Sequence, residues 1–164
     1  MTKKFSPITL FCFSIACLFF SPSFSQTSLP PFKMYRSNNS IFSATELPKN
    51  KPVIVIYFDP ECDHCQKLMS EVFKKINSFK KAEIVMVTFK PVEEVAAFEK
   101  KHKTHNYSNI IVGTEGTSYQ LRNYYKLMNM PFTALYDNDH KLNSSYGQDI
   151  SVDELIKRLQ SLKR

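Results

Sequence analysis

The apolar positions of this chain form short continuous runs that alternate with stripes at helical spacing. Residues 53–58 read Val-Ile-Val-Ile-Tyr-Phe, a β-branched and aromatic run that is typical of a central strand buried on both faces. Seven apolar residues then recur at helical spacing: Cys65, Leu68, Met69, Val72, Phe73, Ile76 and Phe79. They form one stripe and predict an amphipathic helix of about four turns.

The remaining segments extend this alternation. Apolar runs predict three further strands, at residues 83–89, 132–136 and 141–146. Helical spacing and capping residues predict three further helices, from Pro91 to about residue 101, from 119 to 127 after a Thr117 or Ser118 cap, and from Ser151 to about residue 162. Three segments are less regular: an edge strand at 32–35, a loop or short helix at 41–47, and a short strand or loop at 109–113. The whole pattern predicts an α/β sheet that ends in an antiparallel hairpin.

The first 25 residues differ from the rest and indicate export. Lys3 and Lys4 precede an almost uninterrupted apolar run at residues 8–20, which is too short for a membrane span. Ser23-Phe24-Ser25 then places small residues where a signal peptidase cleaves. We therefore predict a signal peptide at residues 1–25, cleavage near Ser25, and one mature domain at residues 26–164 without a membrane span.

Two alternatives to cleavage near Ser25 stay open. A lipoprotein signal would place the lipid on Cys17, but Ser14 stands where such a signal needs an aliphatic residue. The apolar run could also remain as an uncleaved anchor. Cleavage is preferred because the basic start, the short apolar run and the small residues occur in the order of a secretory signal.

Composition and charge narrow the class of protein. The chain has 164 residues, 43% of them hydrophobic and 23% charged, which suits one globular domain with a single core. Its net charge is +7, and loss of Lys3 and Lys4 with the signal would lower this by two. The basic residues are scattered and are read as solvated helix faces. Because the sequence has no nucleic-acid-binding motif, we expect no nucleic-acid partner. We also expect the protein to be a monomer.

The cysteine count concentrates the chemistry in one motif. Two of the four cysteines, Cys12 and Cys17, fall in the predicted signal, so Cys62 and Cys65 are the only thiols of the mature chain. This excludes a framework of structural disulfides despite the export. A Cys-x-x-Cys pair can act as a redox dithiol, hold a metal, or be an inert structural pair.

The local pattern distinguishes the two sulfurs. Cys65 lies on the apolar stripe, whereas Cys62 lies one turn earlier, so we expect Cys62 to be the more exposed sulfur and Cys65 the more sheltered one. The positive end of the helix and a protonated His64 favour a thiolate at Cys62, and Glu61 and Asp63 oppose it. The sign of the sum, and hence the direction of electron flow, stays open.

These residues resemble the thioredoxin superfamily. Cys62-Asp63-His64-Cys65 stands between such a strand and such a helix, and Met130-Pro131 precedes a later strand. In detail the chain is similar to extracytoplasmic thioredoxin-like proteins of Bacteroidetes-type bacteria, which carry a Phe-Asp-Pro-x-Cys-x-x-Cys segment. The resemblance covers residues 51–163. It implies a thioredoxin-like fold, a central mixed sheet flanked by helices, with an insert between Phe89 and Pro131.

The resemblance also implies roles for single residues. Cys62 would be the attacking thiol and Cys65 the resolving thiol, with a redox-active Cys62–Cys65 disulfide. Pro131 would be a cis-proline facing the pair, and the backbone of Met130 would bind an extended substrate. Gly147 resembles a small residue that lets substrate approach. Asp63 and His64 would tune the thiol pKa values.

The sequence departs from thioredoxin itself in the same region. Glu61 replaces the tryptophan that usually precedes the first cysteine, and Asp63-His64 replaces Gly-Pro. Ile56 stands where thioredoxin buries an acid in the central strand. These departures argue against a general reductase role but leave thiol exchange intact, because exchange requires only two accessible sulfurs.

The resulting hypothesis is an enzyme, an exported thiol–disulfide oxidoreductase of the periplasm or another extracytoplasmic space. It would exchange disulfides with cysteine-containing proteins there and be recycled by a thiol redox partner, with no cofactor and no metal. The alternative is a thioredoxin-fold metal-binding protein or metallochaperone that binds copper or zinc through the same pair, since soft thiolates suit Cu(I). Its candidate further ligands are His102, His105 and His140, which have no motif spacing to the cysteines, whereas His64 lies inside the motif itself.

Overall fold

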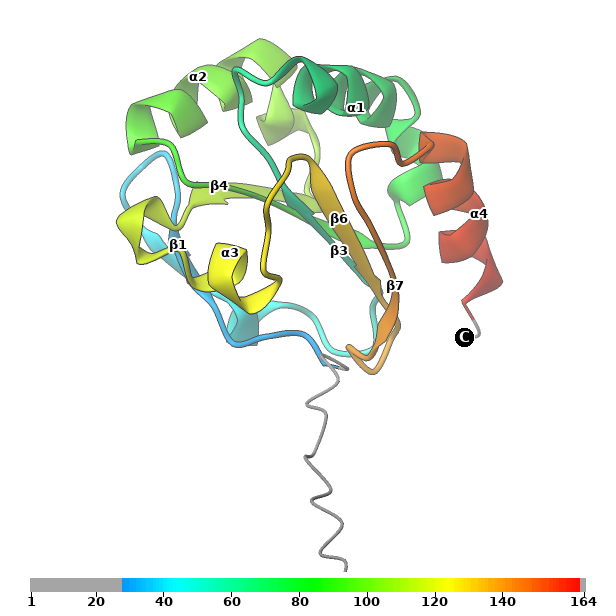
Figure 1. Cartoon of the computed structure of the whole chain (residues 1–164). Coiled ribbons are helices and arrows are strands. Elements are labelled where there is room, and N and C mark those ends of the chain that lie inside the picture. The colour runs from blue at the N-terminus through cyan, green and yellow to red at the C-terminus, as the bar shows by residue number, and fades with distance from the viewer. Residues whose placement is uncertain (1–27, 163–164) are drawn as a thin grey trace, which may run out of the picture.

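Seven strands form one mixed sheet in the computed structural model, which describes residues 28–162 (Figure 1). Their order across the sheet is β2–β1–β5–β4–β3–β6–β7. The strands are β1 (Lys33–Tyr35), β2 (Ile41–Ser43), β3 (Val53–Tyr57), β4 (Glu83–Thr88), β5 (Ile110–Thr114), β6 (Phe132–Tyr136) and β7 (Leu142–Tyr146). The three central strands β5, β4 and β3 are parallel to one another, and the outer pairings are antiparallel. The expected signal peptide, with Cys12 and Cys17, lies outside the described residues.

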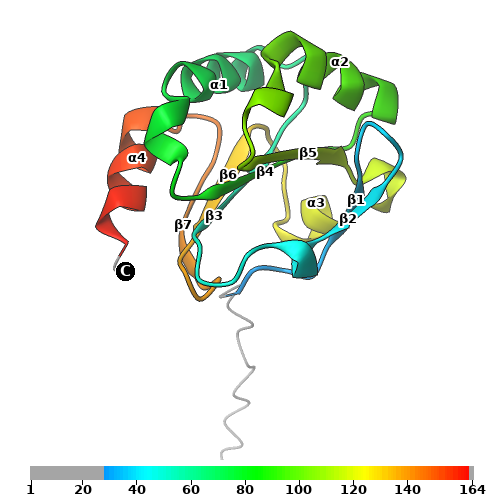
Figure 2. The same cartoon turned by 180° about the vertical axis from the view of Figure 1, so that it is seen from behind.

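Helices cover both faces of this sheet. They are α1 (Asp63–Lys74), α2 (Val92–His102), α3 (Gln120–Tyr124) and α4 (Val152–Ser161). The buried residues of α1, α2 and α4 pack in one core cluster, whereas α3 packs in a second cluster on the opposite face (Figures 1 and 2). The predicted α/β sheet flanked by helices is confirmed. Within the described range, no helix combines the length and apolar character that a membrane crossing needs.

Strand β3 is the structural centre of the site. It pairs with β4 on one side and β6 on the other, and all five of its residues are fully buried. Ile54 and Ile56 face the α1 side, and Val55 and Tyr57 face the α3 side. Burying each such side chain stabilises the fold by about 1.5–3 kcal/mol, so this run anchors the loop that follows it. The predicted central strand is confirmed.

Several elements differ from the sequence prediction. The segment read as a loop or short helix at 41–47 holds strand β2 and a 3-10 turn at Ala44–Glu46. Because β2 occupies the edge, β1 lies inside the sheet and is not the edge strand we expected. Helix α1 ends at Lys74, and the apolar stripe continues in a 3-10 helix at Ile76–Phe79.

The segment between Phe89 and Pro131, where we expected an insert, contains α2, β5 and α3. Strand β5 is an interior strand, and Gly113 permits its pairing with β1: a Cβ there would lie 2.8 Å from Met34 Sδ and from the Tyr35 carbonyl oxygen. Helix α3 is shorter than expected. It starts after Tyr119, whose left-handed backbone (φ 46°) prevents an earlier start, so the predicted cap at Thr117 or Ser118 is wrong.

A buried carboxylate joins this insert to the central strand. Glu115 is 4% exposed and accepts hydrogen bonds from the Tyr57 hydroxyl at 2.7 Å and from the Leu121 N–H at 2.6 Å. The Arg122 N–H donates to it at 3.3 Å. Burial, reinforced by the bond to Glu115, holds the pKa of Tyr57 well above its usual value. The Glu115 carboxylate thus caps the start of α3 by accepting hydrogen bonds from its backbone N–H groups.

Candidate active site

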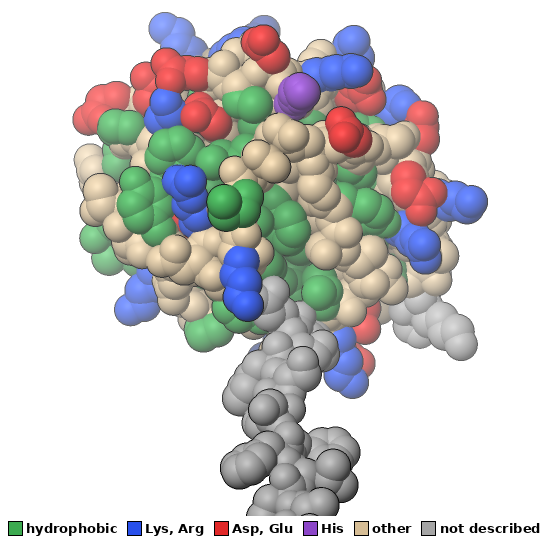
Figure 3. Space-filling view, viewed as in Figure 1, with side chains coloured by type: hydrophobic (Ala, Val, Ile, Leu, Met, Phe, Trp, Pro, Cys, Tyr) green, Lys and Arg blue, Asp and Glu red, His purple; other side chains and the backbone are tan. Residues whose placement is uncertain are grey.

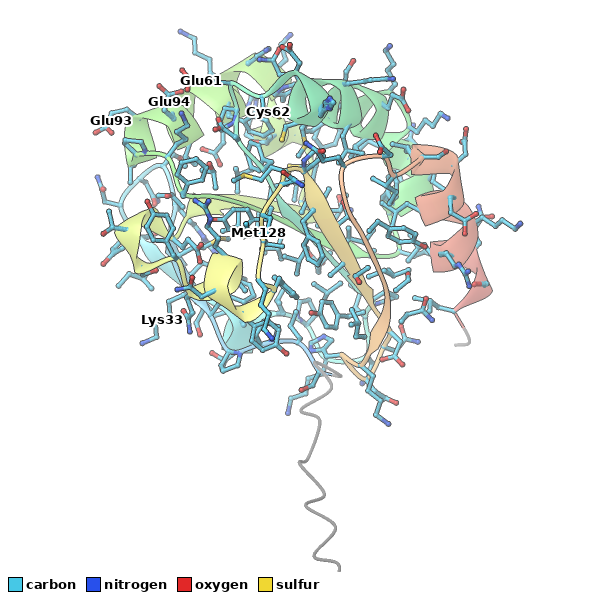
Figure 4. The ribbon with its side chains drawn as sticks, viewed as in Figure 1. Lys33, Glu61, Cys62, Glu93, Glu94 and Met128 are labelled. Carbon is cyan, nitrogen blue, oxygen red and sulfur yellow. The ribbon has the colours of Figure 1, made fainter. Side chains whose placement is uncertain are left out.

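The Cys-x-x-Cys motif lies where β3 ends and α1 begins, at the carboxyl end of the parallel strands (Figure 4). Cys62 is the N-cap residue of α1 with an extended backbone, and its N–H donates to the Asp59 carbonyl at 3.1 Å. The first turn of the helix therefore points its positive end toward Cys62, which favours negative charge there. Neither Asp59 nor Asp63 acts as the cap of this helix.

The two sulfurs have different surroundings. Cys62 is half-buried and Cys65 is fully buried, as the apolar stripe predicted, and both are free thiols. Burial raises the pKa of the Cys65 thiol to about 12, an effect that the Asp59 N–H opposes by donating to its sulfur at 3.4 Å. Cys65 is therefore protonated at neutral pH, and Cys62 is the sulfur that a large partner can reach.

The backbone carbonyl of Met130 faces the half-buried sulfur of Cys62. The Cys62 thiol donates to the Met130 oxygen at 3.8 Å, and the Met130–Pro131 peptide bond is cis. The side-chain amide of Gln148 donates to the same oxygen at 2.8 Å. The structure thus brings both cysteines, Met130 and Pro131 together at one place. It leaves Gly147 with open space, since a Cβ there would meet nothing within 4 Å.

Lys90 neutralises the acids that flank Cys62. Its ammonium group forms ion pairs with Glu61 and, at 3.6 Å, with Asp59. The hydrogen bond to Lys90 lowers the pKa of Glu61, and the pKa of Lys90 is raised in return. The parallel register pairs Tyr57 with Val87, so the residues that follow β4 lie beside the residues that follow β3. The ion pair with Lys90 therefore largely compensates the negative charge of Glu61, which opposes a thiolate at Cys62.

Replacing Lys90 by methionine is expected to slow the alkylation of Cys62 by iodoacetamide about two- to fivefold at pH 7. Two uncompensated carboxylates beside the sulfur disfavour the thiolate, and partly exposed pairs have effects of this size. The rate is measured in a Cys65→Ser background at low salt, and added salt should reduce the difference. Lys67→Met, an exposed lysine on α1, is the control. Equal rates for all three proteins would rule out this role for Lys90.

The expected tuning residues Asp63 and His64 lie on the first turn of α1 and are exposed. In the part of the chain that the structure describes, neither side chain hydrogen-bonds to a sulfur. Both line a cavity of about 590 Å³ between α1 and the loop after β7, together with Gln148 and Asp149. Asp63 and His64 therefore face this cavity, whose lining includes neither cysteine.

A second cavity, of about 330 Å³, reaches the buried sulfur. Its walls include Asp59, Cys65, Phe58, Met69, Phe98 and His102. Ile56 is fully buried, so the core beside Cys65 is apolar at the position where thioredoxin has an acid. The walls of the cavity are mostly apolar but include Asp59 and His102, and its volume has room for water beside Cys65.

The histidines do not gather around the cysteines. Within residues 28–162 there is no group of three or more His, Cys, Asp or Glu side chains that could hold a metal ion. His102 stacks on Phe73 and lies tilted against Phe98, with ring centroids 4.6 and 4.5 Å apart, and burial lowers its pKa. The two residues that sequence reasoning missed at the site are Lys90 and Gln148. Only Lys90 had a usable signal, its place directly after a strand next to β3.

Comparisons with known proteins bear on the family and the fold. The profile of the AhpC/TSA family matches residues 26–159. A thiol-disulfide oxidoreductase from Bacteroides fragilis is 18% identical, with a TM-score of 0.66 over 83% of this chain and 99% of the other. The exposed lipoprotein thioredoxin of Streptococcus pneumoniae is 18% identical, with a TM-score of 0.62 over 81% and 100%. A secreted disulfide oxidoreductase from Mycobacterium tuberculosis is 17% identical, with a TM-score of 0.67 over 80% and 96%.

These similarities confirm the thioredoxin-like fold. At identities below one fifth they establish the fold and carry no assignment of single residues. No curated protein matches the sequence.

Proposed function

The chain belongs to the AhpC/TSA family and is a thioredoxin-like oxidoreductase, and on this premise we propose that it is an exported enzyme that exchanges disulfides with extracytoplasmic proteins. One observation carries the proposal. A half-buried Cys62 at a helix N-terminus faces the Met130 carbonyl, while Cys65 is fully buried in the core. This arrangement gives one sulfur to the partner and keeps the other for the second step.

In the first step, the Cys62 thiolate attacks one sulfur of a substrate disulfide. A bond forms between Cys62 and that sulfur, the substrate S–S bond breaks, and the leaving thiolate takes a proton from water. The helix N-terminus and Lys90, which compensates Glu61, both support the attacking charge. No electron carrier is needed, because the electron pair moves between sulfurs.

In the second step, Cys65 resolves the mixed disulfide. Its thiol loses a proton and attacks the Cys62 sulfur, so the Cys62–Cys65 disulfide forms and the substrate leaves as a reduced thiol. With a pKa of about 12, Cys65 holds its proton in the free enzyme, and the 330 Å³ cavity lets water remove it. The reverse sequence oxidises a substrate. A thiol donor or acceptor of the same compartment recycles the enzyme.

The substrate would dock beside Cys62 as an extended peptide. Met130 and Pro131 form the wall opposite the sulfur, and the Met130 carbonyl can accept a peptide N–H. The face seen in Figures 3 and 4 has hydrophobic side chains over its centre, and Met128 on it is 87% exposed. This apolar area would contact the substrate protein around its reactive cysteine.

The location proposed for this chemistry is extracytoplasmic. Residues 1–25 have the order of a secretory signal, and two of the structural neighbours are described as secreted or as an exposed lipoprotein. Outside the cytoplasm the Cys62–Cys65 pair can meet protein disulfides. The mature enzyme is proposed to act as a monomer in the periplasm after cleavage near Ser25.

Replacing Cys65 by serine is expected to trap Cys62 in mixed disulfides, because the second step has lost its sulfur. Tagged Cys65→Ser protein should accumulate in dithiothreitol-sensitive complexes in its host, seen on non-reducing gels and identified by mass. The matched control is the Cys62→Ser, Cys65→Ser double variant, which should trap nothing. Absence of any trapped protein, together with failure of the wild type to reduce or oxidise a model protein disulfide, would contradict the proposed function.

A further inference from the structure

Two donors converge on one carbonyl at the mouth of the site. The Met130 oxygen accepts from the Gln148 side-chain amide at 2.8 Å and from the Cys62 thiol at 3.8 Å. The distance to Gln148 is that of an ordinary hydrogen bond, whereas the thiol contact is long. A carbonyl oxygen has two acceptor directions, and the contact from Gln148 is the shorter of the two that this oxygen receives here.

The topology fixes Gln148 in this position. Strand β6 begins just after Pro131 and pairs with β7, and the register places Thr133 opposite Tyr146. The loop that follows β7 therefore lies beside the segment that precedes β6. Gly147 leaves open space at the start of this loop, and Gln148 lines the 590 Å³ cavity that runs along the start of α1. Its exposed side chain crosses from that loop to Met130.

The bond resembles the one that an incoming peptide would make. A peptide that pairs with Met130 offers a backbone N–H, and the side-chain amide of Gln148 is the same kind of donor at the same distance. We propose that Gln148 is a displaceable gate, which occupies the Met130 carbonyl in the free enzyme and yields it to the backbone N–H of a substrate peptide. The inference rests on the proposed function and specifies its substrate class.

The gate selects among disulfides. A peptide with an N–H at the right position replaces the lost hydrogen bond, so the exchange costs little. A peptide with proline or an N-methylated residue at that position has no donor and cannot repay the loss of the Gln148 bond. A small disulfide without amides reacts at Cys62 without needing the carbonyl. Gln148 is thus a specificity-determining residue outside the thiol chemistry.

The test compares Gln148→Ala with the wild type on two probes. One is an extended peptide disulfide, and the other is hydroxyethyl disulfide, which has no amide. The rate of the first step is followed by mixing reduced mature protein with each probe. Because one hydrogen bond is no longer displaced, the variant should react about three to ten times faster with the peptide and within twofold of wild type with hydroxyethyl disulfide.

Two further arms sharpen the comparison. Peptides N-methylated in turn at the cysteine and at each neighbouring residue should include one that reacts several times more slowly than the parent peptide with both proteins, because it offers no N–H to the Met130 carbonyl. Gln160→Ala, which truncates an exposed glutamine on α4 away from this cavity, should leave both probes unchanged. A slower reaction of Gln148→Ala with the peptide, an equal change with both probes, or no change with either would overturn the gate. Failure of wild type itself to react with the peptide would instead contradict the proposed function.

Discussion

Replacing Cys62 by serine is expected to slow exchange with a peptide disulfide by at least about a thousandfold. A serine hydroxyl stays protonated at neutral pH and is a poor nucleophile toward sulfur, so the first step is lost. The rate is measured with reduced mature protein under pseudo-first-order conditions. The matched control is Cys65→Ser, which should form the mixed disulfide at a rate within about threefold of wild type and then stop.

Cys65 is not expected to rescue the Cys62→Ser variant. Its sulfur is fully buried, and burial raises its pKa to about 12, so it offers almost no thiolate to an external disulfide at pH 7. In that variant, the rate of Cys65 alkylation should rise with pH over the whole range in which the protein stays folded. Substantial exchange by Cys62→Ser at neutral pH would show that the roles of the two sulfurs are reversed.

The difference in burial between the two sulfurs follows from local sequence, which is why it could be predicted. The run at residues 53–58 can be buried only in the centre of a sheet, and the spacing of the stripe places Cys65 inside and Cys62 at the helix start. Both properties depend on residues that are close in sequence. Local sequence alone therefore indicates which of the two sulfurs is buried, without knowledge of any long-range contact.

Lys90 and Gln148 depend on contacts between distant segments. Lys90 reaches Glu61 because β4 lies beside β3, and Gln148 reaches Met130 because β7 lies beside β6. Strand β2 was missed for a related reason: three residues carry little periodicity, and its pairing with β1 decides its form. Such features need the strand order, which a single sequence does not contain.

The burial of Glu115 in the core likewise could not be predicted, because nothing in the sequence indicated that this acid is buried. Replacing it by alanine is expected to lower the free energy of unfolding by about 3–5 kcal/mol. The Tyr57 hydroxyl and the Leu121 N–H would both lose a buried acceptor, and each unsatisfied donor costs about 1–3 kcal/mol. Urea unfolding followed by far-UV circular dichroism measures the change.

Two matched variants separate the contributions to this loss. Glu115→Gln keeps one acceptor oxygen but presents an amide donor to a donor, so it should cost about half as much as alanine. Tyr57→Phe removes the hydroxyl and leaves Glu115 bonded to Leu121 and Arg122, so it should cost about 1 kcal/mol. A loss below about 1 kcal/mol for Glu115→Ala would show that water replaces the carboxylate, and that α3 is joined to β3 by apolar packing alone. The predicted order, alanine worse than glutamine and glutamine worse than the tyrosine change, follows from the number of buried donors left without an acceptor.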